Sequence, residues 1–205
     1  MKRTMLAALL AVTACLGTAA IGAQPPQIYS SKAEYDPLFE KLVHTDVIVE
    51  GPARSTHVLY VFFDANCYYC NLTWKALRPY LKAGLQVRWV PVAYQQASSA
   101  GRAAAILEAR DRVAALRANE TKYNAAHYDG GIAPQARVSA KLSASLADNT
   151  KLMQTFGAPG TPALVWKDQQ GSIRFKVGMP RLSELPAITG LAEQKITERE
   201  LREYR

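Results

Sequence analysis

The stretch that decides the fold is VLYVFFDANCYYC, residues 58–70. Its first six residues form an apolar run that predicts a buried β-strand. Two turn formers, Asp64 and Asn66, follow this run, and a helical pattern begins at Cys67. The two cysteines that close the stretch therefore lie where a strand gives way to the first turn of a helix.

Cys67 and Cys70 form a Cys-x-x-Cys pair, and no other cysteine remains once the N-terminal export segment is set aside. At the first turn of a helix, unpaired backbone N–H groups and the positive end of the helix dipole favour an anion. We therefore expect a stabilised thiolate at Cys67, and a thiolate rather than a thiol attacks a disulfide. Cys70 lies one turn further along the same face, where it can close a ring with Cys67 and expel a captured substrate.

A structural zinc site and a structural disulfide are the alternatives for this pair. Zinc is commonly held by a second Cys-x-x-Cys or by two closely spaced histidines. The histidines of the chain are widely separated: His44, His57 and His127. A disulfide that spans only two residues constrains little of the unfolded chain. The pattern favours a redox-active dithiol, which needs no metal and no organic cofactor, and His127 is interpreted as a surface or packing residue.

Residues 1–23 have the pattern of a secretory signal peptide. Lys2 and Arg3 precede an apolar stretch, and small residues follow it up to Ala23. The apolar stretch is interrupted and gives way to polar and proline residues, so a permanent membrane span is the weaker interpretation. We expect a mature protein in the periplasm. The alternative is a lipoprotein anchored at Cys15, because residues 12–15 resemble a bacterial lipoprotein processing site.

Charge and length bound the class of protein. The chain has 25 Lys and Arg against 17 Asp and Glu, and loss of Lys2 and Arg3 with the signal would leave 23 basic residues. They are scattered, without a dense block or interleaved aromatic residues, which argues against a nucleic-acid surface. About 180 mature residues suit a single domain with a proper core. Two cysteines do not make a disulfide-stapled scaffold, so we expect them to react.

Helix and strand patterns alternate on both sides of the cysteine pair. A helix that joins two strands makes them parallel, whereas a hairpin adds antiparallel strands. The sequence therefore predicts an α/β fold, a mixed sheet flanked by helices, with the cysteines at the end of the first core strand, where sites collect in such sheets. The expected elements, in order, are a flexible arm at 24–31, a helix at 36–44, a strand at 58–63, the cysteine-bearing helix to about 81, a strand at 85–92, a helical insertion at about 95–156 with an Ala-rich helix at 99–118 and more helix from 134, a hairpin of strands at 163–166 and 173–177, and a final helix capped by Ser183.

This organisation resembles the thioredoxin fold, and more closely the periplasmic DsbC and DsbG thiol:disulfide interchange proteins. The resemblance is carried by VFFDANCYYC at 61–70, by DNTKLMQTFGAPGTPA at 148–163, and by the hairpin that ends in Val177-Gly178. It extends from about 36 to 190 and includes the helical insertion. Together these motifs are specific, although Cys-x-x-Cys alone would be less so.

The resemblance implies a role for each matching residue. Cys67 matches the attacking cysteine, Cys70 the resolving one, and Tyr69 the aromatic residue before the second cysteine. Thr161 and Pro162 match the cis-proline loop, which faces the disulfide and helps to hold an extended substrate. A cis X-Pro bond is uncommon enough to indicate a purpose. The alternative is an ordinary trans proline that opens a strand.

Two departures from DsbC and DsbG affect what can be carried over. Tyr68, which we include with Tyr69 among the substrate-binding residues, replaces the Gly or Pro that follows the first cysteine in those relatives, so their reduction potential does not transfer. Residues 24–52 form only a leader and a linker helix before the thioredoxin-like domain at 53–205, where those relatives have a dimerisation domain. We therefore expect a monomer with weak isomerase activity.

The sequence as a whole predicts a thiol:disulfide oxidoreductase, a DsbC- or DsbG-like isomerase or reductase that acts on exported cysteine-containing proteins. Its redox partner would be a membrane protein, DsbD-like or DsbB-like. One alternative is a monomeric dithiol oxidase. Another is a noncatalytic substrate-binding or chaperone module that uses the same fold as a peptide platform.

Overall fold

The computed structural model describes residues 28–30 and 35–205. The expected signal peptide and Cys15 lie outside these residues. Six strands form one mixed sheet in the order β1-β6-β5-β3-β4-β2, in which β3 and β4 are parallel and the other neighbours are antiparallel. The strands are β1 (Ile28–Ser30), β2 (Ile48–Glu50), β3 (Val58–Asp64), β4 (Gln86–Val92), β5 (Ala163–Lys167) and β6 (Ile173–Val177).

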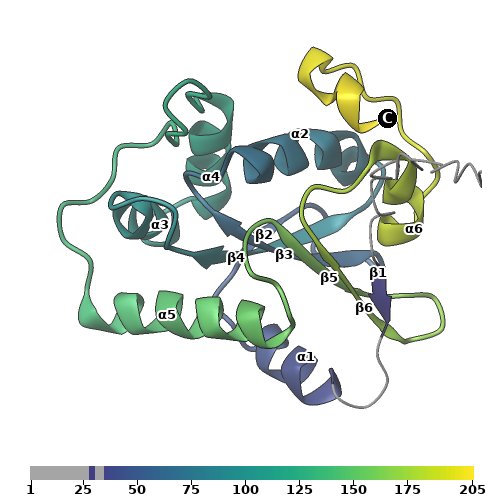
Figure 1. Ribbon diagram of the computed structural model, residues 1–205, viewed down its shortest axis with the longest axis horizontal. Coiled ribbons are helices and arrows are strands. Elements are labelled where there is room, and N and C mark those ends of the chain that lie inside the picture. Colours follow the sequence, from purple (N-terminus) through teal and green to yellow (C-terminus); the bar gives the residue numbers. More distant parts are fainter. Residues whose placement is uncertain (1–27, 31–34) are drawn as a thin grey trace, which may run out of the picture.

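Helices cover both faces of this sheet (Figure 1). On one face lie α2 with α3, α4 and α6, and on the other lie α1 and α5. The helices are α1 (Asp36–Val43), α2 (Tyr68–Lys82), α3 (Ser99–Leu107), α4 (Arg112–Thr121), α5 (Ala140–Thr155) and α6 (Leu185–Thr189), with 3-10 turns η1 (Leu182–Glu184) and η2 (Arg199–Tyr204).

Strand β3 is an apolar run from Val58 to Phe63 because it is buried from both sides. Leu59, Val61 and Phe63 face the core that α2 covers. Tyr60 and Phe62 point the other way, into the core under α1 and α5. Successive side chains of a strand alternate between faces, so a central strand with two covered faces is a continuous hydrophobic run. This burial fixes the position of the cysteine pair that follows the strand.

The structure confirms the expected α/β class, the strand before the cysteines, the cysteine-bearing helix and the closing hairpin. The helical insertion differs in detail. The Ala-rich segment forms two helices, because Asp111 caps α4 by accepting a hydrogen bond from Ala114 N at 2.9 Å. The next helix was expected from about 134 but begins at Ala140, with Ser139 as its N-cap. The segment before Ser139 is irregular.

Both ends of the described chain also differ from expectation. Strand β1 lies in the segment interpreted as a flexible arm and pairs with β6, and β2 pairs with β4 in the connection after α1. The final helix is short: α6 spans five residues and ends at Gly190, which has a left-handed backbone (φ 69°), and η2 follows. Gly190 leaves no room for a side chain, because an added Cβ would lie 2.9 Å from His57 Nδ1.

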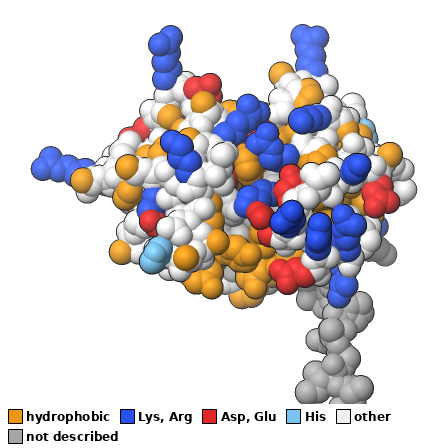
Figure 2. Space-filling view, turned by 90° about the horizontal axis from the view of Figure 1, so that it is seen from above, with side chains coloured by type: hydrophobic (Ala, Val, Ile, Leu, Met, Phe, Trp, Pro, Cys, Tyr) orange, Lys and Arg blue, Asp and Glu red, His pale blue; other side chains and the backbone are white. Residues whose placement is uncertain are grey.

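The surface carries mixed charge. Figure 2 shows Lys and Arg side chains spread over one face with Asp and Glu among them. Several cations are paired, as in Arg174 with Asp168 at 2.6 Å and Arg117 with Glu50 at 2.8 Å. Among the described residues, no helix is both long and apolar enough to cross a bilayer.

Candidate active site

Cys67 is the N-cap of helix α2. Its backbone is extended (φ −79°, ψ 118°), and its sulfur accepts a hydrogen bond from the Cys70 backbone N–H at 3.3 Å. The Cys67 N–H in turn donates to the Asp64 carbonyl at 2.9 Å, which closes the turn between strand and helix. An N-cap side chain faces the orphan N–H groups of the first helical turn, so this sulfur lies where negative charge is favoured.

The pKa values of the two thiols are shifted in opposite directions. A hydrogen bond from the Cys70 side chain lowers the pKa of Cys67, helped by the Thr161 side chain and the Cys70 backbone N–H and opposed by burial. Complete burial raises the pKa of Cys70 well above its usual value, and the interaction with Cys67 adds to this. Cys67 is therefore the group that ionises first, and Cys70 keeps its proton and donates it toward the Cys67 sulfur. Both side chains are largely covered, with 4% of Cys67 and 1% of Cys70 exposed.

The Thr161-Pro162 bond is cis, as expected from the sequence. Its loop lies directly against the cysteine pair, since Cys67 Sγ is 3.5 Å from the Thr161 carbonyl oxygen. Pro162 leads into β5, which pairs with β3, and its carbonyl accepts from Gly178 N at 2.8 Å. Residues almost a hundred positions apart in the chain thereby meet at one edge of the sheet.

Asp64, at the end of β3, is a buried carboxylate with four hydrogen-bond donors. Oδ1 accepts from Asn66 N at 2.9 Å and Ser99 Oγ at 2.8 Å. Oδ2 accepts from Tyr94 N at 2.9 Å and Gln95 N at 3.0 Å. A buried charge is tolerated when it is this well satisfied. Asp64 therefore joins the end of β3, the loop after β4 and the start of α3 beneath the cysteines.

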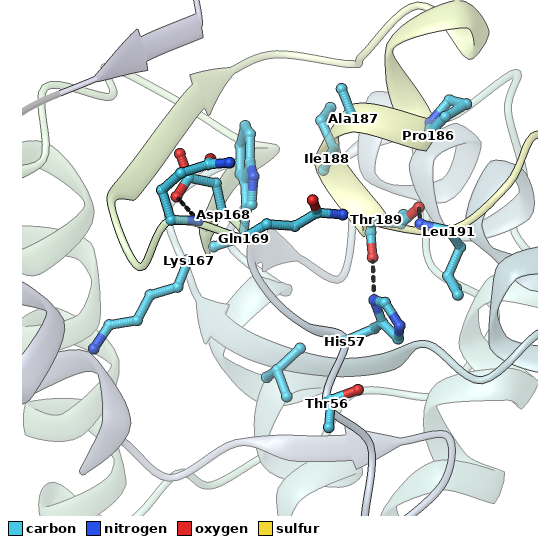
Figure 3. Close-up of a pocket in the computed structure, with 14 residues that line it drawn as sticks. Thr56, His57, Lys167, Asp168, Gln169, Pro186, Ala187, Ile188, Thr189 and Leu191 are labelled. Atoms are coloured by element: carbon cyan, nitrogen blue, oxygen red, sulfur yellow. Dashed lines mark hydrogen bonds between the residues drawn. The ribbon is translucent and has the colours of Figure 1, made fainter.

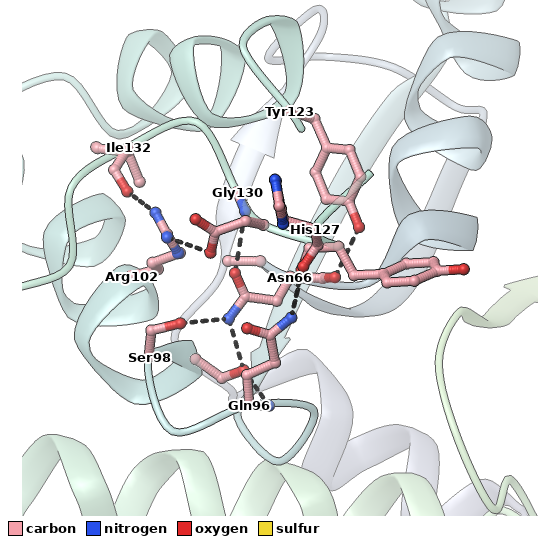
Figure 4. A network of polar contacts seen from close by, with 12 residues as sticks. Asn66, Gln96, Ser98, Arg102, Tyr123, His127, Gly130 and Ile132 are labelled. Carbon is pink, nitrogen blue, oxygen red and sulfur yellow. Dashed lines mark hydrogen bonds and ion pairs between the residues drawn. The ribbon is translucent and has the colours of Figure 1, made fainter. Parts of the chain in front are cut away.

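Asn66 extends this polar network into the helical insertion (Figure 4). Its side-chain amide donates to Ser98 Oγ and Ser99 Oγ, both at 3.0 Å, and its Oδ1 accepts from Gly130 N at 3.0 Å. Its backbone carbonyl accepts from Tyr123 Oη at 2.8 Å. The residue just before Cys67 is thus held from three sides, which leaves the N-terminus of α2 little freedom.

Tyrosine side chains surround the cysteine pair. The Tyr68 ring lies 5.5 Å from that of Tyr69, 6.4 Å from Tyr123 and 6.1 Å from Tyr128. Tyr69 and Tyr128 are 51% and 58% exposed, and Tyr94 on the other side is 42% exposed. Of the large apolar or aromatic side chains that are exposed in the described chain, only Val49 lies elsewhere. The surface around Cys67 is therefore aromatic and solvent-facing.

The six residues singled out from the sequence adjoin one another in the structure. Sequence reasoning took Asp64 only as a turn former and overlooked Tyr94, Tyr123 and Tyr128 altogether. Tyr94 could have been found, because it closely follows a strand parallel to β3, and the carboxyl ends of parallel strands meet at the same edge. The two tyrosines of the insertion left no comparable signal. The His127 side chain is exposed, and the backbone carbonyl of His127 accepts from Gln96 Nε2 at 3.4 Å.

A separate cavity of about 680 Å³ lies at the opposite end of β3 (Figure 3). Two of its polar lining side chains are already engaged, since His57 Nδ1 lies 3.1 Å from the Thr189 carbonyl and Asp168 binds Arg174. It contains neither cysteine. Among the described residues, no three His, Cys, Asp or Glu side chains gather into a group that could hold a metal ion. The two cysteines thus lie beneath the aromatic surface and not in this cavity.

Comparison with known proteins agrees with this geometry. Residues 46–189 match the family model described as a thioredoxin-like domain. The chain is 31% identical over 154 residues to the thiol:disulfide interchange protein DsbG of Pseudomonas aeruginosa, covering 75% of this chain and 59% of that protein, and 29% identical to DsbG of Escherichia coli, covering 75% and 60%. It thus spans about three fifths of the length of these curated relatives.

The solved structures agree on the fold. A periplasmic thioredoxin-like protein from Salmonella enterica serovar Typhimurium superimposes with a TM-score of 0.60 at 19% identity, covering 78% of this chain and 97% of that one. The match of the family model includes the cysteine pair, the helical insertion and the cis-proline loop. On this ground the chain belongs to the thioredoxin-like domain family.

Proposed function

We propose that this protein is a thiol:disulfide oxidoreductase of the periplasm that acts on exported proteins through Cys67 and Cys70. The observation that carries the proposal is the geometry of the pair: the Cys67 sulfur caps α2 at 3.3 Å from the Cys70 backbone N–H and lies 3.5 Å from the Thr161 carbonyl, whereas Cys70 is buried. In agreement, hydrogen bonds to Cys67 lower its pKa, and burial raises the pKa of Cys70. One nucleophilic thiolate beside one protonated thiol is the state that disulfide exchange requires.

The exchange would proceed in two steps. The Cys67 thiolate attacks one sulfur of a substrate disulfide, so that a mixed disulfide forms and the other substrate sulfur leaves as a thiolate. Cys70 then gives its proton to that leaving thiolate and attacks Cys67 Sγ. The Cys67–Cys70 disulfide forms, and the substrate leaves with both cysteines reduced, having gained the two electrons that the pair has lost. The reverse sequence oxidises a substrate.

A protein substrate is supported by the surface around the pair. Tyr68 and Tyr69 provide apolar area and hydroxyl groups that can adapt to different sequences. The Thr161 carbonyl, which keeps a second lone pair beside its contact with Cys67, could accept a hydrogen bond from an extended segment, as exposed strand-like edges do when they bind peptides. Substrate recognition by these four residues is part of the proposal.

The proposal also concerns whether the protein reduces or oxidises its substrates. The similarity to DsbG supports a reductase or isomerase, kept reduced by a DsbD-like membrane protein. The lowered pKa of Cys67 supports the alternative, a dithiol oxidase reoxidised by a DsbB-like partner, because a stabilised thiolate favours the reduced pair and makes its disulfide more oxidising. Equilibration with glutathione buffers decides between them: a potential near that of thioredoxin fits a reductase, and one near that of DsbA fits an oxidase.

Insulin reduction tests the function itself. Wild type should catalyse precipitation of the reduced chains, and Cys67→Ser should abolish the catalysis. Cys70→Ser should accumulate the mixed disulfide, visible by non-reducing electrophoresis, because the resolving thiol is lost. A noncatalytic chaperone module would instead suppress aggregation equally well in all three proteins and show no cysteine-dependent turnover.

A further inference from the structure

Tyr94 makes two contacts with a single residue of the cis-proline loop. Its hydroxyl oxygen accepts a hydrogen bond from Thr161 N at 2.7 Å and lies 3.1 Å from Thr161 Oγ1. The position of Tyr94 is itself fixed, since its backbone N–H donates to the buried Asp64 carboxylate at 2.9 Å. The hydroxyl therefore faces Thr161 from a rigid part of the site.

The proton inventory restricts how these groups can be arranged. A phenol has one proton to donate, and the Thr161 N–H already occupies one acceptor position on its oxygen. If Tyr94 donates to Thr161 Oγ1, the proton of the Thr161 hydroxyl stays free for another acceptor. If Thr161 donates to Tyr94 instead, that proton is used up and cannot reach a third group.

The third group is the Cys67 sulfur. The Thr161 carbonyl lies 3.5 Å from Cys67 Sγ, and it can accept from the thiol but has nothing to donate to a thiolate. The side chain of Thr161 lowers the pKa of Cys67, and that of Cys70 as well. With its hydroxyl as the donor responsible, Thr161 would serve both protonation states of Cys67, its carbonyl the thiol and its hydroxyl the thiolate.

We propose that Tyr94 is a positioning residue that donates its hydroxyl proton to Thr161 Oγ1 and so directs the Thr161 hydroxyl proton at the Cys67 thiolate. Tyr94 acts through Thr161. Hydrogen bonds in such a chain strengthen one another, because each donor becomes more polarised. The inference rests on the proposed function to the extent that the Cys67 thiolate is the group that performs disulfide exchange.

The ionisation of Tyr94 agrees with this arrangement. Burial raises the pKa of Tyr94, and the nearby sulfurs of Cys70 and Cys67 raise it further, whereas its hydrogen bonds with the Thr161 side chain and backbone lower it. The phenol therefore keeps its proton throughout the range in which Cys67 ionises. A donor that stays protonated while its neighbour becomes an anion is what the chain from Tyr94 to Cys67 requires.

The test is a titration of Cys67 in the reduced full-length protein. Thiolate formation is followed by ultraviolet absorbance, and alkylation by iodoacetamide is assigned to Cys67 by peptide mass spectrometry. Tyr94→Phe keeps the ring and removes the hydroxyl. We expect a raised pKa of Cys67 and alkylation about fivefold slower at a pH below that pKa, the factor that corresponds to one hydrogen bond of about 1 kcal/mol.

Variants of Thr161 identify the route. In Thr161→Val, which keeps the backbone N–H and loses the hydroxyl, adding Tyr94→Phe should cause no further loss, whereas Thr161→Ser should titrate like wild type. Tyr80→Phe is the matched control, because Tyr80 Oη also accepts from a backbone N–H, that of Gln194 at 3.3 Å, and takes no part in the site. It should leave the titration of Cys67 unchanged.

Two outcomes would overturn the inference: an unchanged titration in Tyr94→Phe, or an equal loss from Tyr94→Phe in the Thr161→Val background. Neither outcome would affect the proposed function, which insulin reduction tests. Conversely, if the titration responds as expected and insulin reduction shows no dependence on Cys67, the positioning role stands and the proposed function fails. The two measurements therefore separate the two claims.

Discussion

At the scale of single residues, Cys67 and Cys70 differ because one sulfur faces backbone donors and the other is sealed in the core. The Cys67 sulfur accepts from Cys70 N and lies against Thr161, whereas Cys70 is 1% exposed. We expect iodoacetamide at mildly acidic pH to modify Cys67 first in the reduced protein. Mass spectrometry of the singly labelled species checks this, and faster labelling of Cys70 would reverse the assignment of the attacking thiol.

The same difference gives the stability of the reduced protein a definite pH dependence. The pKa of Cys67 is lower folded than unfolded, so its contribution is present above the ordinary thiol pKa of 9.0 and is lost as the pH falls through its lowered folded pKa. The pKa of Cys70 is raised, so the folded state loses stability as the pH rises above the same ordinary value. Thermal unfolding of reduced protein should show both slopes, and Cys67→Ser should lack the first while keeping the second.

At the scale of elements, α4 of the insertion is joined to α2 through a buried carboxyl group. Asn71, which follows Cys70, donates to the Glu120 carbonyl at 2.7 Å and to its Oε2 at 2.9 Å, and Asn119 donates to Oε1 at 3.0 Å. Burial raises the pKa of Glu120 from 4.5 to about 7, and these hydrogen bonds only partly oppose it. The carboxyl group therefore takes up a proton near neutrality.

Glu120→Gln should remove this titration. A carboxyl group with a raised pKa stabilises the fold at low pH, and that contribution is lost as the pH rises from about 4.5 to about 7. Wild type should therefore lose stability relative to Glu120→Gln across this interval, with the difference levelling off above it. Chemical denaturation at several pH values measures the difference. A constant offset between the two proteins would show that Glu120 does not titrate there.

The elements also mark the limits of what the sequence could predict. Strand β3, helix α2 and the hairpin were predictable because an apolar run, a helical pattern and a turn are local signals. Strands β1 and β2 have three residues each, too few to display an alternation, and they exist through pairing with β6 and β4. The break between α3 and α4 did have a signal, the cap Asp111, which the Ala-rich composition concealed.

The candidate site also contains residues that the sequence could predict and residues that it could not. The roles expected of Cys67, Thr161 and Pro162 came from motifs, and the structure brings these residues together. The functions of Asp64 and Tyr94 depend on hydrogen bonds between segments about thirty residues apart, such as the one from Tyr94 N to Asp64 Oδ2. Such partners are determined by the packing of the whole sheet, so no local sequence pattern predicts them.

At the scale of the whole molecule, exposed aromatic side chains are concentrated around the cysteine pair. Tyr69 and Tyr128 come from α2 and from the insertion, and the Tyr68 ring lies between them. We expect the double variant Tyr69→Ser/Tyr128→Ser to raise the KM for an unfolded disulfide-bonded protein roughly tenfold, about 1.4 kcal/mol, because aromatic contacts contribute on the order of 0.5–1.5 kcal/mol each. The rate with a small aromatic disulfide should change little.

Val49→Ser is the control for this double variant. Val49 is also exposed, at 44%, but lies in β2 at the edge of the sheet. Val49→Ser should leave the KM for the protein substrate at the wild-type value. Equal losses with the protein and the small disulfide would mean that the tyrosines affect the cysteines themselves and not substrate binding.

The near-complete covering of Cys67 has a consequence for which bonds the protein can open. With 4% of the residue exposed, very little of Cys67 meets solvent. A disulfide has to project from its own chain to reach this sulfur, as it does on a loose loop or an incompletely folded segment. Bonds enclosed in the interior of a finished protein stay out of reach. On the proposed function, the enzyme would therefore exchange the accessible disulfides of incompletely folded substrates and leave the buried disulfides of native proteins intact.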